Sequence, residues 1–126
     1  MNATIREWIE KAEADLATAR RELVASDFPN YDAVCFHAQQ CVEKLMKALL
    51  IQLGITPPKT HQLLALHNLL KPVCADWDPR IEDLRFLSRA AVDFRYPGES
   101  ADQTEAQEAV EIATKLREIL VRLMGE

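Results

Sequence analysis

The feature that most constrains this chain is a run of apolar side chains at three- and four-residue steps between Tyr31 and Leu53. The repeating members are Val34, Ala38, Cys41, Val42, Leu45, Met46, Leu49 and Leu53. That spacing is typical of an α-helix with one buried face. Such a helix would be about 30 Å long, at roughly 1.5 Å per residue. It therefore predicts a core made by packing other helices against it.

Similar periodicity predicts four further helices, separated by segments that contain proline or glycine. They are expected from Thr4 to about Ser26, from His61 to Leu70, from Pro79 to about Phe94, and from Ser100 or Asp102 to Met124. Thr4 with Glu7 fits a capping box, and Gly54 is the expected stop of the second helix. Short connections between long helices favour an antiparallel arrangement. We predict an all-α, up-and-down bundle of four to five helices, with residues 1–126 in a single domain.

Composition narrows the classes of protein. The chain has 126 residues, 48% of them apolar, and only three glycines, which suits one helical domain. Its net charge of −5 argues against general attraction to nucleic acid or to anionic membranes. Charges interrupt every apolar stretch, and the N-terminus lacks a signal-peptide pattern, so we expect a cytoplasmic protein without a membrane helix. Three cysteines without CxxC spacing predict reduced thiols and no disulfide.

A polar stripe lies beside the apolar face of the second helix. His37, Gln40, Lys44 and Lys47 recur at helical spacing and form a candidate ligand-binding surface. The lysines would supply charge for a phosphate, and His37 or Gln40 would supply oriented hydrogen bonds. In the structural alternative, both lysines cover apolar neighbours with their ammonium groups in water, while His37 and Gln40 bond to the loop after the fourth helix. Glu43 would then pair with Lys47.

A second candidate surface lies at the end of the fourth predicted helix. Arg85, Arg89 and Asp93 share one helix face, and Arg95 and Tyr96 follow at once. Guanidinium groups match phosphate oxygens, and a tyrosine can stack on a base, so Arg89, Asp93, Arg95 and Tyr96 are candidate ligand-binding residues. The competing interpretation is an Arg89–Asp93 ion pair followed by a rigid YPG turn.

Other chemistry finds little support in the sequence. His37 and Cys41 are one turn apart, but no further ligands complete a zinc site, so we predict no metal. The isolated glycines form no phosphate-binding loop, and we predict no cofactor. In the last helix, Ile112, Ile119 and Val121 add apolar area outside the main core stripe, and this excess could serve a homodimer.

Three segments carry a family resemblance. They are AEADLATARREL, then YDAVCFHAQQCVEKLMKALLIQLGITPPKTHQLLAL, then AVDFRYPGE. In these segments the chain resembles the HEPN domain family, small helical proteins found alone or beside nucleotidyltransferases in prokaryotes. The resemblance covers nearly the whole chain. It implies a bundle of four or five helices that often dimerises, with roles in nucleotide or RNA association and in pairing with a minimal nucleotidyltransferase.

The chain departs from the nuclease members of that family. Catalytic HEPN proteins carry an arginine, four to six further residues, and then a histidine late in the domain, whereas here no histidine follows His67. We therefore expect no catalytic residues of that type. The leading hypothesis is a non-catalytic or weakly active module that homodimerises, associates with a nucleotidyltransferase-like partner and binds a nucleotide. The alternatives are a divergent ribonuclease of a toxin-antitoxin system, using Arg89 or Arg95, and a purely structural helical adaptor.

Overall fold

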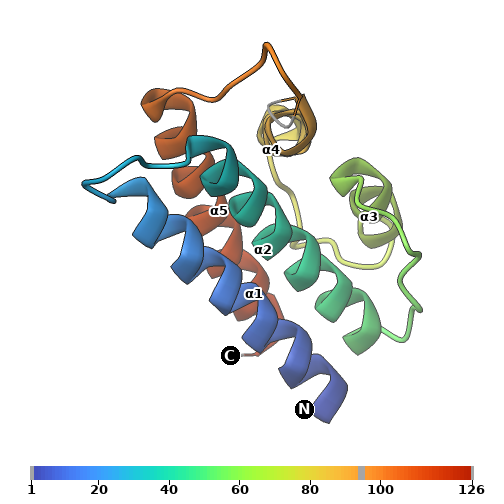
Figure 1. The fold of residues 1–126 in the computed structure, drawn as a ribbon. Coiled ribbons are helices and arrows are strands. Elements are labelled where there is room, and N and C mark those ends of the chain that lie inside the picture. The colour runs from blue at the N-terminus through green and yellow to red at the C-terminus, as the bar shows by residue number, and fades with distance from the viewer. Residues whose placement is uncertain (1, 94–95, 126) are drawn as a thin grey trace.

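The computed structural model describes residues 2–93 and 96–125, without the side chain of Asp93 (Figure 1). The helices are α1 (Ala3–Leu23), α2 (Tyr31–Gln52), α3 (Leu63–Leu70), α4 (Ile81–Asp93) and α5 (Gln103–Leu123). Within those ranges there is no strand, and no helix is long and apolar enough to cross a bilayer. The predicted all-α fold is confirmed.

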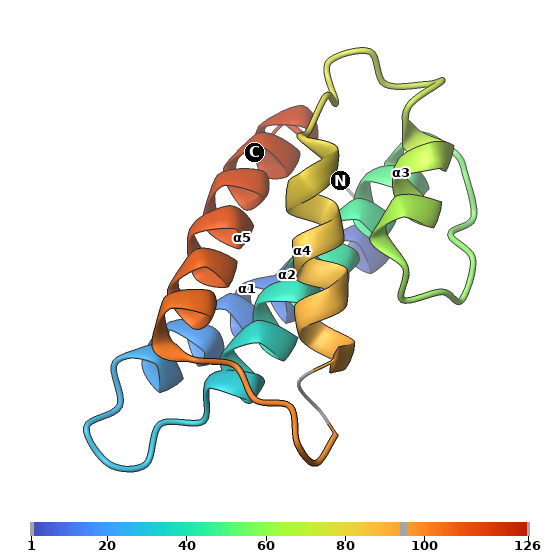
Figure 2. The same ribbon diagram turned by 90° about the horizontal axis from the view of Figure 1, so that it is seen from above.

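Helix α2 is the centre of the bundle and contacts each of the other four helices. Helix α1 lies beside it and runs in the opposite direction, while α5 packs behind this pair and α4 crosses them (Figures 1 and 2). Hydrogen bonds join the matching ends of α2 and α5. The Gln52 side chain donates to the Met124 carbonyl at 3.4 Å, and the Ala101 backbone N–H donates to Asp32 at 2.7 Å. The two helices therefore run in the same direction.

The core is aliphatic and centred on α2. The apolar residues predicted to face inward from this helix are buried, except Leu53 at the end, which is 39% exposed. Ile112 also belongs to the core, and Ile119 and Val121 pack half-buried against it. The apolar flank assigned to the last helix is therefore largely used inside the monomer.

Helix starts differ from prediction where a better capping group is available nearby. The Asn2 side chain, not Thr4, caps α1, accepting a hydrogen bond from the Ile5 backbone at 2.8 Å. Asparagine is among the strongest N-cap residues, and starting here lets Thr4 lie inside the first turn. At α5, Asp102 and Glu105 form a capping box.

The two short central helices start later than predicted. Helix α3 begins at Leu63 rather than His61, because Thr60 accepts a hydrogen bond from the Gln62 backbone in a local turn. Helix α4 begins at Ile81, two residues after Pro79. The predicted end of α4 at Phe94 lies outside the described residues. At the end of α2, Gly54 has φ +83°, a left-handed conformation that suits its predicted role as the helix stop.

Two cysteines serve as core residues. Cys35 and Cys41 are completely buried free thiols, and all three cysteines are unpaired. The pKa of each buried thiol is raised to about 12, chiefly by burial and also by nearby carboxylates, led by Glu105 for Cys35 and Glu13 for Cys41. Because the thiolate is the reactive form, these two side chains act as small apolar groups at neutral pH.

The loop between α3 and α4 is fixed to the core by a buried pair. Trp77 is 3% exposed, and its indole N–H donates to His67 Nδ1 at 3.0 Å. Burial lowers the pKa of His67, the positive charge of Lys71 lowers it further, and Asp78 opposes them. A neutral His67 is needed here, since a protonated Nδ1 could not accept the indole hydrogen bond.

Stability should therefore fall as the pH drops below about 6.5, the ordinary histidine pKa. In that range the unfolded chain binds a proton at His67 that the folded chain resists, so acid favours unfolding. We expect the urea midpoint to be lower at about pH 5.5 than at about pH 7.5. The His67→Gln variant keeps an acceptor for Trp77 and should show a smaller pH dependence. Equal dependence in both proteins would contradict this assignment.

Candidate functional site

The polar stripe of α2 is divided between two carboxylates. The first is Asp15 of α1, which is largely buried. His37 Nδ1 lies 2.8 Å from one of its oxygens and Lys44 Nζ lies 2.5 Å from the other. Asp15 therefore joins α1 to α2 through two side chains that the sequence had suggested as ligand contacts.

The second carboxylate is Glu43, which is 3% exposed. It accepts hydrogen bonds from Lys47 at 3.1 Å, from Gln40 at 3.3 Å and from Gln39 at 3.2 Å. The predicted Glu43–Lys47 pair is thus confirmed. Lys47 is itself buried, and its ammonium group lies 5.8 Å from the centre of the Trp8 ring. The buried Glu43 carboxylate thus has an ion pair and further hydrogen bonds, which a buried charge needs to offset its loss of hydration.

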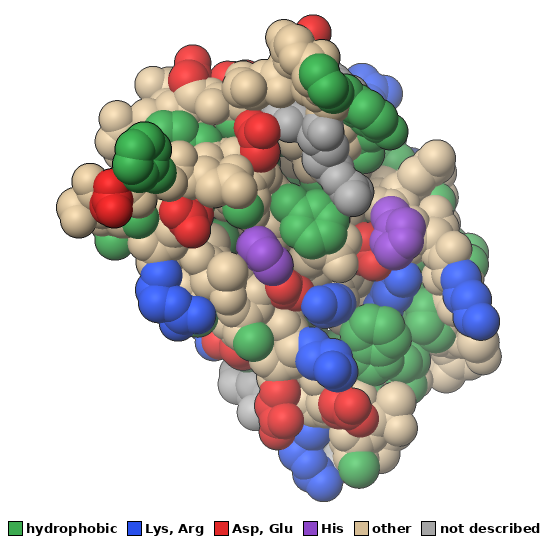
Figure 3. All heavy atoms as spheres, viewed as in Figure 1, with side chains coloured by type: hydrophobic (Ala, Val, Ile, Leu, Met, Phe, Trp, Pro, Cys, Tyr) green, Lys and Arg blue, Asp and Glu red, His purple; other side chains and the backbone are tan. Residues whose placement is uncertain are grey.

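These contacts correct the structural alternative given for the stripe, whereas its ligand-binding role stays a prediction. The lysine ammonium groups do not extend freely into water, because each is held by a carboxylate. His37 and Gln40 bond to Asp15, Gln39 and Glu43, and among the described residues neither bonds to the loop after α4. Figure 3 shows the result as acidic and basic side chains intermixed on this face. Charge that is already neutralised attracts an anionic ligand only weakly.

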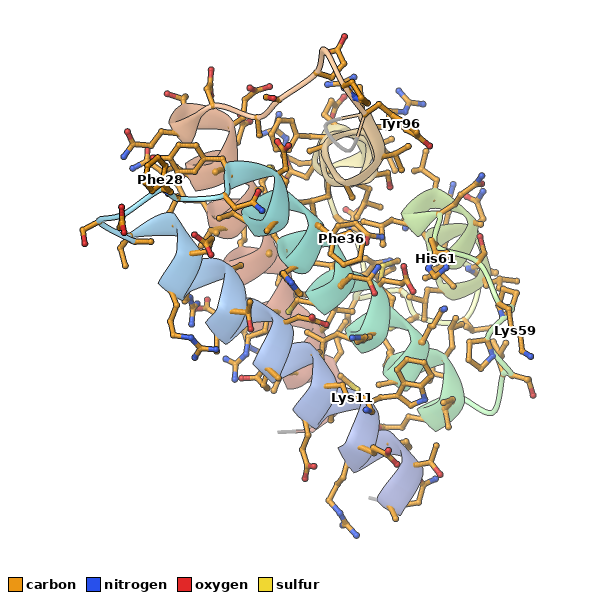
Figure 4. The ribbon with its side chains drawn as sticks, viewed as in Figure 1. Lys11, Phe28, Phe36, Lys59, His61 and Tyr96 are labelled. Atoms are coloured by element: carbon orange, nitrogen blue, oxygen red, sulfur yellow. The ribbon has the colours of Figure 1, made fainter. Side chains whose placement is uncertain are left out.

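Glu43 also holds a residue from outside the stripe. His61, in the connection between α2 and α3, places Nδ1 3.1 Å from both oxygens of Glu43. Gln39 donates to the His61 carbonyl at 3.0 Å and so fixes the backbone at the same point. The His61 side chain is nevertheless 81% exposed, whereas that of Glu43 is 4% exposed. Figure 4 shows His61 and Phe36 near each other, where α2 faces the α2–α3 connection.

The most open part of the site lies between α2, α3 and α4. A cavity of about 350 Å³ is lined by Phe36, Gln39, Gln40, His61, Ser88, Ala91 and Val92. A second, of about 550 Å³, is lined by Gln62, Leu64, Arg85, Ser88 and Arg89. Since Ser88 lines both cavities, we treat them as one groove, the α3–α4 groove. The Ser88 hydroxyl is buried there and has no hydrogen-bond partner among the described residues.

Two arginines on α4 border this groove. Arg85 and Arg89 are one helical turn apart and exposed, and neither has an ion pair or hydrogen bond to a described residue. Their guanidinium groups carry paired donors that match the oxygens of a phosphate. Unlike Lys44 and Lys47, they are not neutralised by any carboxylate that the structure describes. The groove therefore joins these cationic donors to an apolar wall and several amides.

The remaining predicted residues lie at the end of α4. Tyr96 is 65% exposed and projects near the top of the molecule in Figure 4. The side chains of Asp93 and Arg95 lie outside the described residues, so the Arg89–Asp93 ion pair stays a prediction. Among the described residues, no group of three or more His, Cys, Asp or Glu side chains is placed to hold a metal ion.

Sequence reasoning missed Asp15, His61 and Ser88 as members of the site. Asp15 could have been noticed, because it lies at core spacing between Ala12 and Leu16, where an acid needs a partner. The position of His61 could not be read from periodicity, since it lies in a connection whose path depends on tertiary contacts.

Nearly the whole chain matches one family of known proteins. The HEPN domain model matches residues 5–124. The crystal structure of TT1696 from Thermus thermophilus is similar, with 27% identity, a TM-score of 0.77, and coverage of 94% of this chain and 97% of that one. ST0689, an archaeal HEPN homologue, shows 25% identity and a TM-score of 0.66, with 96% and 95% covered. Among curated proteins none matches. With nearly its full length matched by one family model, the chain belongs to the HEPN domain family.

Proposed function

We propose that this protein is a non-catalytic HEPN module that binds a phosphate-bearing ligand, a nucleotide or RNA, in the α3–α4 groove. The observation that supports this most is the pair of arginines without a described partner, Arg85 and Arg89, beside a cavity of about 550 Å³. Every other predicted cation of the site with a described side chain is already paired with a carboxylate. A nuclease of the usual family type is not proposed, because no histidine follows His67.

The proposal includes two protein contacts. As a HEPN domain the chain is proposed to form a homodimer and to associate with a nucleotidyltransferase-like protein, in the manner of a toxin-antitoxin pair. Val92, which lines the groove, and Tyr96, which follows α4 in the sequence, are exposed and give this end of α4 a surface that such a partner could cover. Light scattering of the purified protein, alone and with the partner, measures both associations.

Calorimetric titration with ATP, GTP and short RNA tests the ligand proposal. We expect saturable binding by at least one of them, weakened about tenfold or more by Arg85→Ala and by Arg89→Ala, since each removes a charged donor. Binding should also weaken with added salt. Arg122→Ala is the matched control, because Arg122 is an exposed arginine of α5 that does not line the groove.

Two outcomes would count against the proposal. Binding that survives the combined Arg85→Ala and Arg89→Ala substitutions would place the ligand elsewhere. No binding by any of the three ligands would favour a role in protein association alone. Gel analysis of the RNA after titration addresses the alternative of a divergent ribonuclease, which would shorten the RNA.

A further inference from the structure

The imidazole of His61 is held in one orientation although its side chain is exposed. An exposed histidine ordinarily samples several rotamers, but here Nδ1 lies 3.1 Å from both oxygens of a buried carboxylate. An ionised Glu43 can only accept hydrogen bonds, so the neutral ring carries its proton on Nδ1. The lone pair of Nε2 is then free, and no described residue hydrogen-bonds to this atom.

The free nitrogen belongs to a residue that lines the α3–α4 groove. His61 lines the cavity of about 350 Å³, and Ser88 joins this cavity to the one bordered by Arg85 and Arg89. An oriented nucleophile, a carboxylate behind it and cationic donors nearby are the elements of covalent catalysis on phosphate. They come together here in a chain that lacks the nuclease histidine of its family.

We propose that His61 is a phosphoryl acceptor, which takes a phosphoryl group from an activated phosphate such as an acyl phosphate. Nε2 would attack phosphorus, forming a P–N bond while the P–O bond to the acyl group breaks. The acyl carboxylate leaves with the bonding electron pair. The ring gains a positive charge, which Glu43 stabilises through the Nδ1–H hydrogen bond. This inference rests on the proposed function, since Arg85 and Arg89 would bring the phosphoryl group into the groove.

The protein contains an internal control for this chemistry. His37 also places Nδ1 against a buried carboxylate, that of Asp15, at 2.8 Å. Its side chain is only 31% exposed, it shares Asp15 with Lys44, and it does not line the groove. A carboxylate partner alone would activate both histidines, whereas access to the groove distinguishes His61.

The test is incubation of the protein with acetyl phosphate, followed by intact mass spectrometry and phosphorus NMR. We expect one acid-labile phosphoryl group on nitrogen, formed about tenfold or more faster in the folded protein than in urea-unfolded protein, because folding fixes the reacting groups. His61→Gln should abolish it and His37→Gln should leave it in place. Glu43→Gln should slow it about tenfold or more in variants that keep the helical circular dichroism of the wild type.

Failure of this inference can be told from failure of the proposed function. Absence of labelling, or equal labelling of His37 and His61, overturns the acceptor role whatever the groove binds. Labelling of His61 that Arg85→Ala and Arg89→Ala leave unchanged supports the acceptor but removes the arginines from its mechanism. ATP binding that depends on these arginines, without any labelling by acetyl phosphate, would support the proposed function and reject the acceptor role of His61.

Discussion

Replacing Glu43 by alanine is expected to lower the free energy of unfolding by about 3–5 kcal/mol. The carboxylate is 3% exposed, and Lys47, which it neutralises, is 7% exposed. Removing Glu43 leaves a buried ammonium group without its counter-charge and also releases His61 and Gln39. Urea denaturation of the wild type and of Glu43→Ala measures the effect. Glu111→Ala, on the exposed face of α5, is the control and should change stability by no more than about 0.5 kcal/mol.

A double variant separates the charge from the packing. If the loss in Glu43→Ala comes mainly from the stranded Lys47 charge, Glu43→Met combined with Lys47→Met should recover much of it, because apolar side chains of similar volume often replace a buried ion pair at little cost. A double variant as unstable as Glu43→Ala would contradict that explanation. It would assign the loss to the hydrogen bonds with Gln39 and His61 instead. Of these hydrogen bonds, the one between Glu43 and His61 is the contact on which the proposed acceptor role in the groove depends.

The helices of this protein were predictable because their information is local. The apolar spacing along α2, the Asp102–Glu105 capping box and the stop at Gly54 depend on residues within a few positions of one another. The starts of α1 and α3 were wrong for an equally local reason. Asn2 outcompetes Thr4 as a cap, and a turn at Thr60 delays α3. At each of these two helix starts, the capping or turn contact of a single residue determines where the helix begins.

The candidate site was less predictable, because its contacts join distant parts of the chain. Periodicity correctly placed His37, Gln40, Lys44 and Lys47 on adjoining sectors of one helix. It could not show that Asp15, on another helix, would neutralise Lys44, so the sequence left both a ligand-binding and a structural interpretation of the stripe open. The arginines of α4 differ from Lys44, because no described carboxylate neutralises them. Arg85 and Arg89 stayed without described partners, a fact that only the structure could supply.

Trp77 is another residue whose tertiary contacts could not be read from periodicity, and its replacement should strongly lower the free energy of unfolding. It lies between α3 and α4, outside any helical periodicity, yet its side chain is 3% exposed and belongs to the core. Trp77→Ala should lower the free energy of unfolding by about 3–5 kcal/mol, because the cavity left by an indole is large. Urea denaturation measures this, and a loss below about 1 kcal/mol would contradict the anchoring role of Trp77.

Trp77→Phe distinguishes the two contributions of this side chain. It keeps most of the apolar volume but removes the donor to His67, so it should cost about 1–3 kcal/mol, less than the alanine variant. Trp77 also fixes the connection between α3 and α4, the two helices that contribute Leu64 and Arg89 to the groove. Ligand binding should therefore weaken in Trp77→Ala even at temperatures where the protein stays folded, and to a smaller extent in Trp77→Phe. Unchanged affinity in a folded Trp77→Ala protein would mean that the groove keeps its shape without this anchor.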